Sequence, residues 1–389
     1  MSDDGMAAME QDPGGVVTLA RDLIRCPSVT PDDGCGITAL ATVLERMGFS
    51  VTLLPFGEGA ARTPNLFARL GTGQPHLCFA GHTDVVPVGD ADWSHDPFGG
   101  EIHDGVLFGR GACDMKGGIA AFVAAVRLYL NKFPQPRGSI SLLITGDEEG
   151  PATNGTVRVL EWMEKQGQIP DFCLVGEPTN PAGMGEVIKI GRRGSLNAHI
   201  TVNGTQGHVA YPHRADNPVH RLLALLGELT AAPLDTGSEW FEPSSLQVTS
   251  IDVGNTATNV IPARAGARLN IRFNDLHTGA DLAGWIRTVV ARHAPGADVR
   301  IVISGESFLT EPHAPVEALR AAVRAVTGHV PRLDTGGGTS DARFISRYCP
   351  VAEFGLVGTS MHKADEHVSL ADLKQLTAIY TGFLEKVMR

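Results

Sequence analysis

The middle of the chain restricts the possible folds more than any other segment. Two helical patterns (217–230 and 279–293) lie among four predicted strands. Apolar and polar residues alternate in 195–203, 245–253 and 262–273, and 297–303 is the last strand. A period of two is typical of strands with one buried face. The order strand, helix, strand, strand, helix, strand predicts a ferredoxin-like unit.

The alternation is strictest in residues 262–273. It places six apolar side chains on one face of the predicted strand: Ala263, Ala265, Ala267, Leu269, Ile271 and Phe273. We expect this face to be covered by the two helices.

The flanking sequence has a different pattern, in which short apolar runs alternate with helical stretches. The runs are 76–81, 139–145, 171–176 and 350–356, and the helical patterns are 16–48, 117–133, 154–167, 314–327, 339–347 and 370–388. Such alternation predicts an α/β layer with a largely parallel sheet. The simplest arrangement is one α/β domain (15–180 and 295–389) interrupted by an inserted domain (181–294), and two consecutive domains are the alternative.

Composition agrees with a folded chain of this kind. The 389 residues suffice for two domains, and 43% of them are hydrophobic, which excludes disorder as the main state. The net charge of -11 and the 6% of aromatic residues argue against a nucleic-acid partner. An acidic chain instead suits a site that gathers carboxylates around cations.

No membrane or secretory segment is expected. Residues 1–14 predict a disordered lead without the basic and apolar parts of a signal peptide, and the apolar run 119–126 is too short to span a bilayer. The six cysteines contain no CxxC pair and most lie in apolar segments. We predict that all six are buried reduced thiols, which implies a cytoplasmic protein.

Chemically active residues follow the ends of the apolar runs. His82 and Asp84 follow the first run, Glu148 and Glu149 the second, and Glu177 the third. Because the carboxyl ends of parallel strands meet at one edge of a sheet, these side chains are expected to converge. Each group also has an ordinary interpretation. His82 and Asp84 could be an unrelated pair at a strand end, Glu148 and Glu149 could lie in a solvated acidic turn, and Glu177 could be a loop acid.

Two further candidates come from elsewhere in the chain. Asp114 lies in a glycine-rich loop before a helix, where it could cap the helix or bind a metal. His362 precedes the last helix and is a weak signal alone, because the chain has 14 histidines. Together, two histidines and several carboxylates are the ligands of a two-metal hydrolytic site for Zn²⁺, Co²⁺ or Mn²⁺.

The motifs that carry these residues resemble those of the dinuclear zinc deacylases and exopeptidases, a family that includes aminoacylase and acetylornithine deacetylase. The motifs are GHTDVVP (81–87), GRGACDMKGG (109–118), GDEEG (146–150), GEPT (176–179) and MHKADE (361–366). The resemblance extends from about residue 16 to the C-terminus. It implies a catalytic α/β domain with an inserted ferredoxin-like domain that forms a homodimer.

The resemblance also implies roles for single residues. His82, Asp114 and Glu177 would hold one zinc ion, and Asp114, Glu149 and His362 the other, with Co²⁺ as a possible substitute. Glu148 would be the general base, and Asp84 would orient His82.

Four further segments resemble members of the family that act on a small N-succinyl amino acid: GRRGS (191–195), GHVAYP (207–212), TNVIP (258–262) and GGGTSDARF (336–344). Arg192 and Arg272 are candidates for binding a substrate carboxylate, although a loop charge and a solvated strand face explain them equally. His208 would stabilise the oxyanion across the dimer, unless it is a surface or capping histidine. Asn259 could donate to the substrate or form a turn, and the glycines around Thr339 would let backbone amides approach it.

The expected activity is hydrolysis of an N-succinyl amino acid. A related N-acyl-amino-acid amidohydrolase such as acetylornithine deacetylase, a peptidase and an inactive binding protein are the alternatives. The presence of Glu148 argues against the inactive protein.

Overall fold

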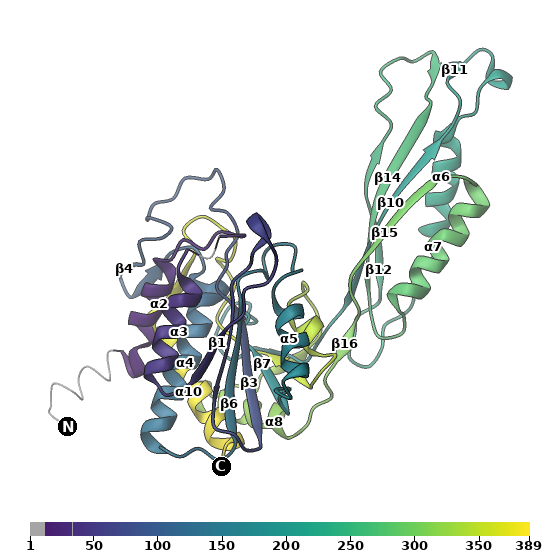
Figure 1. Cartoon of the computed structure of the whole chain (residues 1–389). Coiled ribbons are helices and arrows are strands. Elements are labelled where there is room, and N and C mark those ends of the chain that lie inside the picture. The colour runs from purple at the N-terminus through teal and green to yellow at the C-terminus, as the bar shows by residue number, and fades with distance from the viewer. Residues whose placement is uncertain (1–11, 33) are drawn as a thin grey trace. The chain divides into compact units, whose positions relative to one another are not determined.

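A computed structural model describes residues 12–32 and 34–389, which form two compact units (Figure 1). The first unit comprises Met1–Ile190, Thr310–Asp334 and Ser340–Arg389, and the second comprises Gly191–Leu309 and Thr335–Thr339. The limits of the second unit differ from those expected for the inserted domain, which were residues 181 and 294. Strand β8 (Val187–Lys189) pairs within the sheet of the first unit, and strand β15 (Asp298–Gly305) pairs within that of the second.

An eight-stranded sheet forms the centre of the first unit, in the order β1-β2-β6-β3-β7-β18-β8-β17. Neighbours among β6, β3, β7 and β18 run parallel, as the sequence predicts, whereas β1, β2 and β8 add antiparallel pairs. Besides β8, the strands are β1 (Ser50–Leu53), β2 (Asn65–Leu70), β3 (His76–His82), β6 (Ser139–Thr145), β7 (Phe172–Val175), β17 (Arg332–Asp334) and β18 (Val351–Glu353).

Helices cover both faces of this sheet. Figure 1 shows helices α2, α4 and α10 on one face and α5 on the other. Because both faces are covered, every residue of β3 and β6 is buried, which explains their continuous apolar sequence. The helices of the unit are α2 (Val16–Ile24), α3 (Gly36–Arg46), α4 (Gly117–Lys132), α5 (Thr156–Lys165), α8 (Ala314–Thr327), α9 (Ala342–Ile345) and α10 (Leu370–Val387).

Close packing holds the start of α4 against the end of β7. A Cβ atom added to Gly118 would lie 2.7 Å from the carbonyl oxygen of Gly176, so only glycine fits this approach. The contact places the turn before α4 beside the loop that follows β7.

The second unit has the ferredoxin-like order that the sequence predicts. Its antiparallel sheet, in the order β12-β14-β10-β15, is covered on one face by helices α6 and α7 (Figure 1). Besides β15, the elements are β10 (Gly194–Asn203), β12 (Ser245–Asp252), β14 (Arg264–Phe273), α6 (Pro218–Leu229) and α7 (Gly279–His293). The apolar face of β14 is buried as expected, except that Ala263 precedes the strand and is exposed.

Short strands complete both units. A three-stranded sheet in the first unit joins β4 (Glu101–His103), β5 (Val106–Phe108) and β19 (His367–Ser369). In the second unit β9 (Gly191–Arg192) pairs with β16 (Phe308–Leu309), and β11 (Gly207–His208) pairs with β13 (Val260–Ile261). The helix expected at 339–347 is limited to α9.

The prediction of six reduced cysteines is wrong. Cys26 and Cys35 form a disulfide, and the other four cysteines are free and buried. Cys26 follows α2 and Cys35 precedes α3, and the segment between them folds back on the end of β3, where Val85 and Ser28 form a backbone hydrogen bond. A spacing of nine residues gives no sign of this approach.

Two other expectations concern the N-terminal segment and membranes. Residues 1–11 of the expected lead lie outside the described residues, but Asp12 is ordered and its side chain accepts the amides of Val17 and Thr18 at the start of α2. No helix in the described part of the chain is long and apolar enough to cross a bilayer.

Candidate metal centre and active site

Three neighbouring strands of the first unit bring acidic and imidazole side chains to one sheet edge. His82 is the last residue of β3, Glu148 follows the end of β6, and Glu177 follows the end of β7. Since β3 lies between β6 and β7 and is parallel to both, their carboxyl ends meet. The convergence expected from the sequence is present in the structure.

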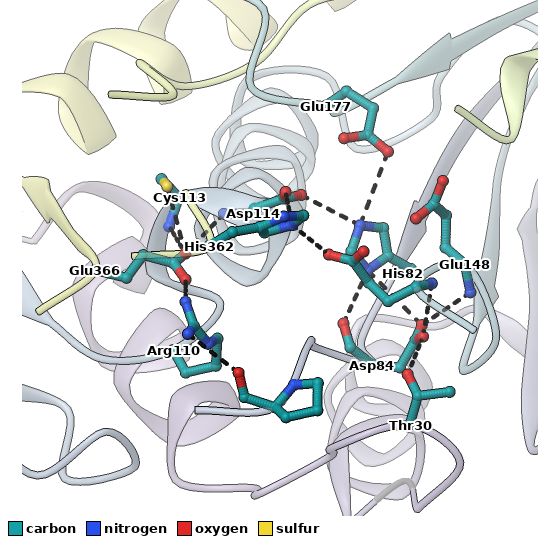
Figure 2. A network of polar contacts seen from close by, with 12 residues as sticks. Thr30, His82, Asp84, Arg110, Cys113, Asp114, Glu148, Glu177, His362 and Glu366 are labelled. Atoms are coloured by element: carbon teal, nitrogen blue, oxygen red, sulfur yellow. Dashed lines mark hydrogen bonds and ion pairs between the residues drawn. The ribbon is translucent and has the colours of Figure 1, made fainter. Parts of the chain in front are cut away.

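Asp114 lies between the two histidines (Figure 2). Its Oδ1 atom is 3.3 Å from Nε2 of His82, and its Oδ2 atom is 3.3 Å from Nε2 of His362. The second histidine also lies 2.9 Å from Oε1 of Glu149. The two carboxylate oxygens of Asp114 therefore face different histidines, which is the arrangement that a carboxylate shared by two cations requires.

The backbone of His362 is unusual. Its φ angle is 62°, in the left-handed region that residues other than glycine rarely adopt. Such conformations cluster at functional sites, where surrounding contacts hold them in place.

Two groups of side chains around His82 could each hold a metal ion. One contains His82, Asp114 and Glu149, and the other contains His82, Glu148 and Glu177, with ligand atoms within 4.8 Å of one another in each. Glu177 Oε1 lies 3.8 Å from His82 Nε2. The groups overlap the expected ligand sets but include Glu148, for which the family resemblance implies a different role.

Asp84 contacts His82 mainly through its backbone. Nδ1 of His82 lies 2.9 Å from the carbonyl oxygen of Asp84 but 3.7 Å from its carboxylate. The carboxylate instead accepts hydrogen bonds from the amides of Glu148 and Glu149 and from the hydroxyl of Thr30. Asp84 thus links the imidazole of β3 to the acidic loop after β6.

The electrostatics of the site favour cations. Burial raises the pKa of Glu148 to about 8, and burial followed by the charge of Asp114 raises that of Glu177 well above its usual range. Hydrogen bonds to Asp114 and Glu149 raise the pKa of His362 to about 10. Burial opposes the charge on His82, but Asp114 and the neighbouring carboxylates raise its pKa overall. The cluster therefore retains protons unless another positive charge replaces them.

The residues present fit a bound metal. Nε2 of His82 and Oδ1 of Asp114 are buried and 3.3 Å apart, but their geometry is not that of a hydrogen bond, which is costly unless a ligand compensates. Imidazole nitrogen and carboxylate oxygen are suitable donors for Zn²⁺, Co²⁺ or Mn²⁺.

A buried ion pair behind Asp114 was not expected from the sequence. Arg110 bonds to Glu366 at 2.8 Å, and both side chains are almost fully buried. The other oxygen of Glu366 accepts the amides of Cys113 and Asp114 and so fixes the turn that carries Asp114 (Figure 2). Arg110 and Glu366 both belong to the motifs quoted above, and their opposite charges were the sequence feature that could have indicated the pair.

Asp341 was also missed. It is buried, neither carboxylate oxygen makes a hydrogen bond by distance and angle, and burial raises its pKa to about 6. Its charge contributes to the raised pKa of Glu148. The GGGTSDARF segment contains this acid, but nothing in its spacing indicated that it would be near the acidic loop.

The expected substrate-binding residues all belong to the second unit. Arg192 is buried in β9 and donates to the carbonyl of Gly336, close in sequence to Thr339, while Arg272 lies on β14. His208 and Asn259 are exposed and lie together, because β11 pairs with β13. Burial and the neighbouring Arg193 lower the pKa of Arg272. Arg193 is a second cation that the sequence interpretation overlooked.

Comparison with known proteins identifies the family. Residues 78–386 match the family described as Peptidase family M20/M25/M40. The chain belongs to this family. The resemblance found in the sequence motifs is thereby confirmed.

Curated relatives cover nearly the whole chain. A protein of Gluconacetobacter diazotrophicus named succinyl-diaminopimelate desuccinylase is 72% identical over 96% of this chain and 97% of its own length. A protein of Gluconobacter oxydans with the same name is 66% identical over 96% of this chain and 97% of its own length.

Solved structures support the fold. An aminopeptidase PepT from Bacillus cereus has a TM-score of 0.78 at 18% identity and covers 97% of this chain and 99% of its own. An M20 family metallo-carboxypeptidase from Sulfolobus solfataricus has a TM-score of 0.76, also at 18% identity, and covers 96% and 99%. At these identities the likeness concerns the fold alone, and it confirms the expected α/β architecture.

Proposed function

We propose that the chain is a metal-dependent succinyl-diaminopimelate desuccinylase. It hydrolyses N-succinyl-LL-2,6-diaminopimelate to succinate and LL-2,6-diaminopimelate, in the synthesis of lysine and cell-wall precursors. The observation that carries the proposal is the full-length relative of that name at 72% identity. The buried cluster around Asp114 supports the hydrolytic chemistry.

Two metal ions would be held at the carboxyl edge of the sheet. His82, Asp114 and Glu177 would hold one, and Asp114, Glu149 and His362 the other. We propose zinc for both, with cobalt as a substitute, because the donors are nitrogen and oxygen atoms. Bound divalent ions polarise the scissile carbonyl and lower the pKa of a nearby water.

Glu148 would transfer the proton. It accepts a proton from the attacking water and returns it to the nitrogen of the leaving amine as the amide bond breaks. The raised pKa supports this role, because an efficient general base and acid titrates near the working pH. The hydrogen bond from its amide to Asp84 would hold the loop that carries it.

Arginines would bind the anionic acyl group. A succinyl group carries a free carboxylate, and guanidinium groups bind carboxylates through paired hydrogen bonds. Arg192 and Arg272 are the proposed partners, and the closeness of Arg193 to Arg272 supports a site for an anion. The backbone near Thr339 would contact the rest of the substrate, and Asn259, which lies beside His208, would do so from the partner subunit of a homodimer.

His208 would act in the partner subunit of a homodimer. Arg192 precedes β10 and His208 follows it, and ten extended residues span about 33 Å, so one substrate cannot contact both in the same chain. β15 is an edge strand with exposed Val302 and Ile303, which supports dimer formation through the second unit. From the partner, His208 would stabilise the oxyanion.

We propose that the reaction takes place in the cytoplasm, with a small-molecule substrate and neither nucleic acid nor membrane as a partner. The Cys26–Cys35 disulfide contradicts the argument from reduced thiols. This localisation therefore rests on the proposed biosynthetic reaction alone.

Substrate comparison tests the activity. The purified protein loaded with Zn²⁺ should hydrolyse N-succinyl-LL-2,6-diaminopimelate with a kcat/KM well above that for N-acetylornithine. Equal or faster cleavage of N-acetylornithine would refute the assignment in favour of another deacylase. Cleavage of neutral dipeptides at the faster rate would instead make the protein a peptidase.

A variant tests the base. Glu148→Ala should keep its bound metal and lose activity by orders of magnitude, whereas Glu164→Ala, on the exposed surface of α5, should behave as wild type. Normal turnover by Glu148→Ala would refute the assigned role.

Mixing two inactive variants tests the dimer. A hybrid of Glu148→Ala and His208→Ala chains has one site with both residues intact, so random mixing restores about a quarter of wild-type activity. If each chain supplies its own His208, the mixture stays inactive.

A further inference from the structure

A second group of side chains that could hold a metal ion lies on strand β4 and on the loop that precedes it in the first unit. Nδ1 of His95 is 3.1 Å from Oε2 of Glu101, and Nε2 of His103 is 3.2 Å from the same oxygen. The three ligand atoms all lie within 4.8 Å of one another. None of these residues belongs to the groups around His82.

The spacing suits a transition metal. Four ligands placed tetrahedrally around Zn²⁺ at about 2.0–2.1 Å lie about 3.3 Å apart. The two contacts to Glu101 are close to this separation. Two imidazoles and one carboxylate are also a donor set found in zinc sites with an open fourth position.

The neighbouring structure holds the ligands in place. The ring of His95 stacks on Phe108 of β5, with ring centroids 4.0 Å apart, and its backbone amide donates to Asp365. Glu101 and His103 stand two residues apart on β4, so their side chains point to the same face of the sheet. His103 is 56% exposed, which leaves the site open to ions from solution.

We propose that His95, Glu101 and His103 bind a divalent transition-metal ion of the Zn²⁺ type, with water completing its coordination. The ion would join the loop at His95 to strand β4 and so close the segment between them. Hydrogen bonds between the two imidazoles and one carboxylate would explain the same distances without an ion, and binding measurements separate the two explanations.

The test is equilibrium dialysis of the holoenzyme against Zn²⁺ at micromolar free concentration. Wild type should bind one more ion per chain than His103→Gln and Glu101→Gln, in which affinity at this site falls at least tenfold. The comparison is a difference between proteins, so it does not depend on how many ions the centre around His82 holds. His329→Gln is the matched control, because His329 is an exposed histidine outside the cluster.

The outcomes are distinct. The site is supported if both cluster variants bind one ion fewer than wild type and His329→Gln binds as many as wild type. His103→Gln should also keep its desuccinylase activity unchanged. Equal binding by wild type and His103→Gln overturns it, and an equal loss in His329→Gln shows only nonspecific binding to surface histidines and also overturns it.

Discussion

Thr30 should be necessary for full activity although it would bind neither metal nor substrate. The carboxylate of Asp84 is fully buried and accepts three hydrogen bonds, of which the bond from the Thr30 hydroxyl, at 2.7 Å, is the shortest. Thr30→Val removes this donor and leaves a buried charge less satisfied. A hydrogen bond to a charged group contributes about 1.5–3 kcal/mol, so the free energy of unfolding should fall by about that amount.

Activity should fall as well, because Asp84 also holds the amides of Glu148 and Glu149. Loss of a contact that orients metal ligands typically costs about 10–100-fold in metal affinity or activity. We therefore expect kcat for the succinyl substrate to fall by about that factor at saturating Zn²⁺, and Thr30→Ser, which keeps the hydroxyl, to restore most of it.

Steady-state kinetics and urea unfolding of each variant measure the two effects. Thr42→Val is the control, since its hydroxyl donates to the Thr38 carbonyl on the exposed face of α3. A Thr30→Val protein that is less stable but has wild-type kcat would refute the link from Asp84 to the acidic loop. A variant unchanged in both would refute the hydrogen bond itself.

Three further predictions concern stability. In metal-free protein the folded state keeps the Glu148 proton up to a pKa of about 8, against 4.5 in the unfolded chain, so the contribution of Glu148 to stability is fully present below about pH 4.5 and is lost as pH rises to about 8. EDTA should therefore lower Tm more at pH 8 than at pH 6, excess Zn²⁺ should remove the difference, and an equal drop at both would contradict the reasoning. Arg110→Met leaves Glu366 buried without its cation and should cost about 3–5 kcal/mol in urea unfolding; a loss below about 1 kcal/mol would mean that the ion pair is dispensable. Reduction of the Cys26–Cys35 disulfide frees a short loop and should cost about 2–3 kcal/mol, so dithiothreitol should destabilise wild type but not Cys26→Ser, and no effect on wild type would exclude the bond.

Local patterns predicted much of the fold. The period of two in residues 262–273 reflects a strand with one buried face, and the continuous apolar runs of β3 and β6 reflect strands buried on both faces. Short strands such as β1, β8 and β17 escaped prediction, because three or four residues carry too little pattern.

The candidate site was also predicted in part. His82, Glu148 and Glu177 could be expected to converge, because parallel strands end at a common edge and each residue follows such an end. Asp341 gave no such signal, since it lies far along the chain and only folding brings its charge to bear on Glu148. The disulfide was missed for a different reason, because a spacing of nine residues gives no sign that the two cysteines meet.

The sequence by itself therefore determined the succession of elements, the inserted ferredoxin-like unit and the residue types of a two-metal site, because these depend on short-range periodicity and on strand ends. Only the tertiary structure decided which atoms meet. It placed the two oxygens of Asp114 toward different histidines, turned the Asp84 carboxylate to the acidic loop and joined Cys26 to Cys35. Such contacts join residues that are distant in the chain or lie in irregular loops, and their geometry is fixed by packing, which no local pattern encodes.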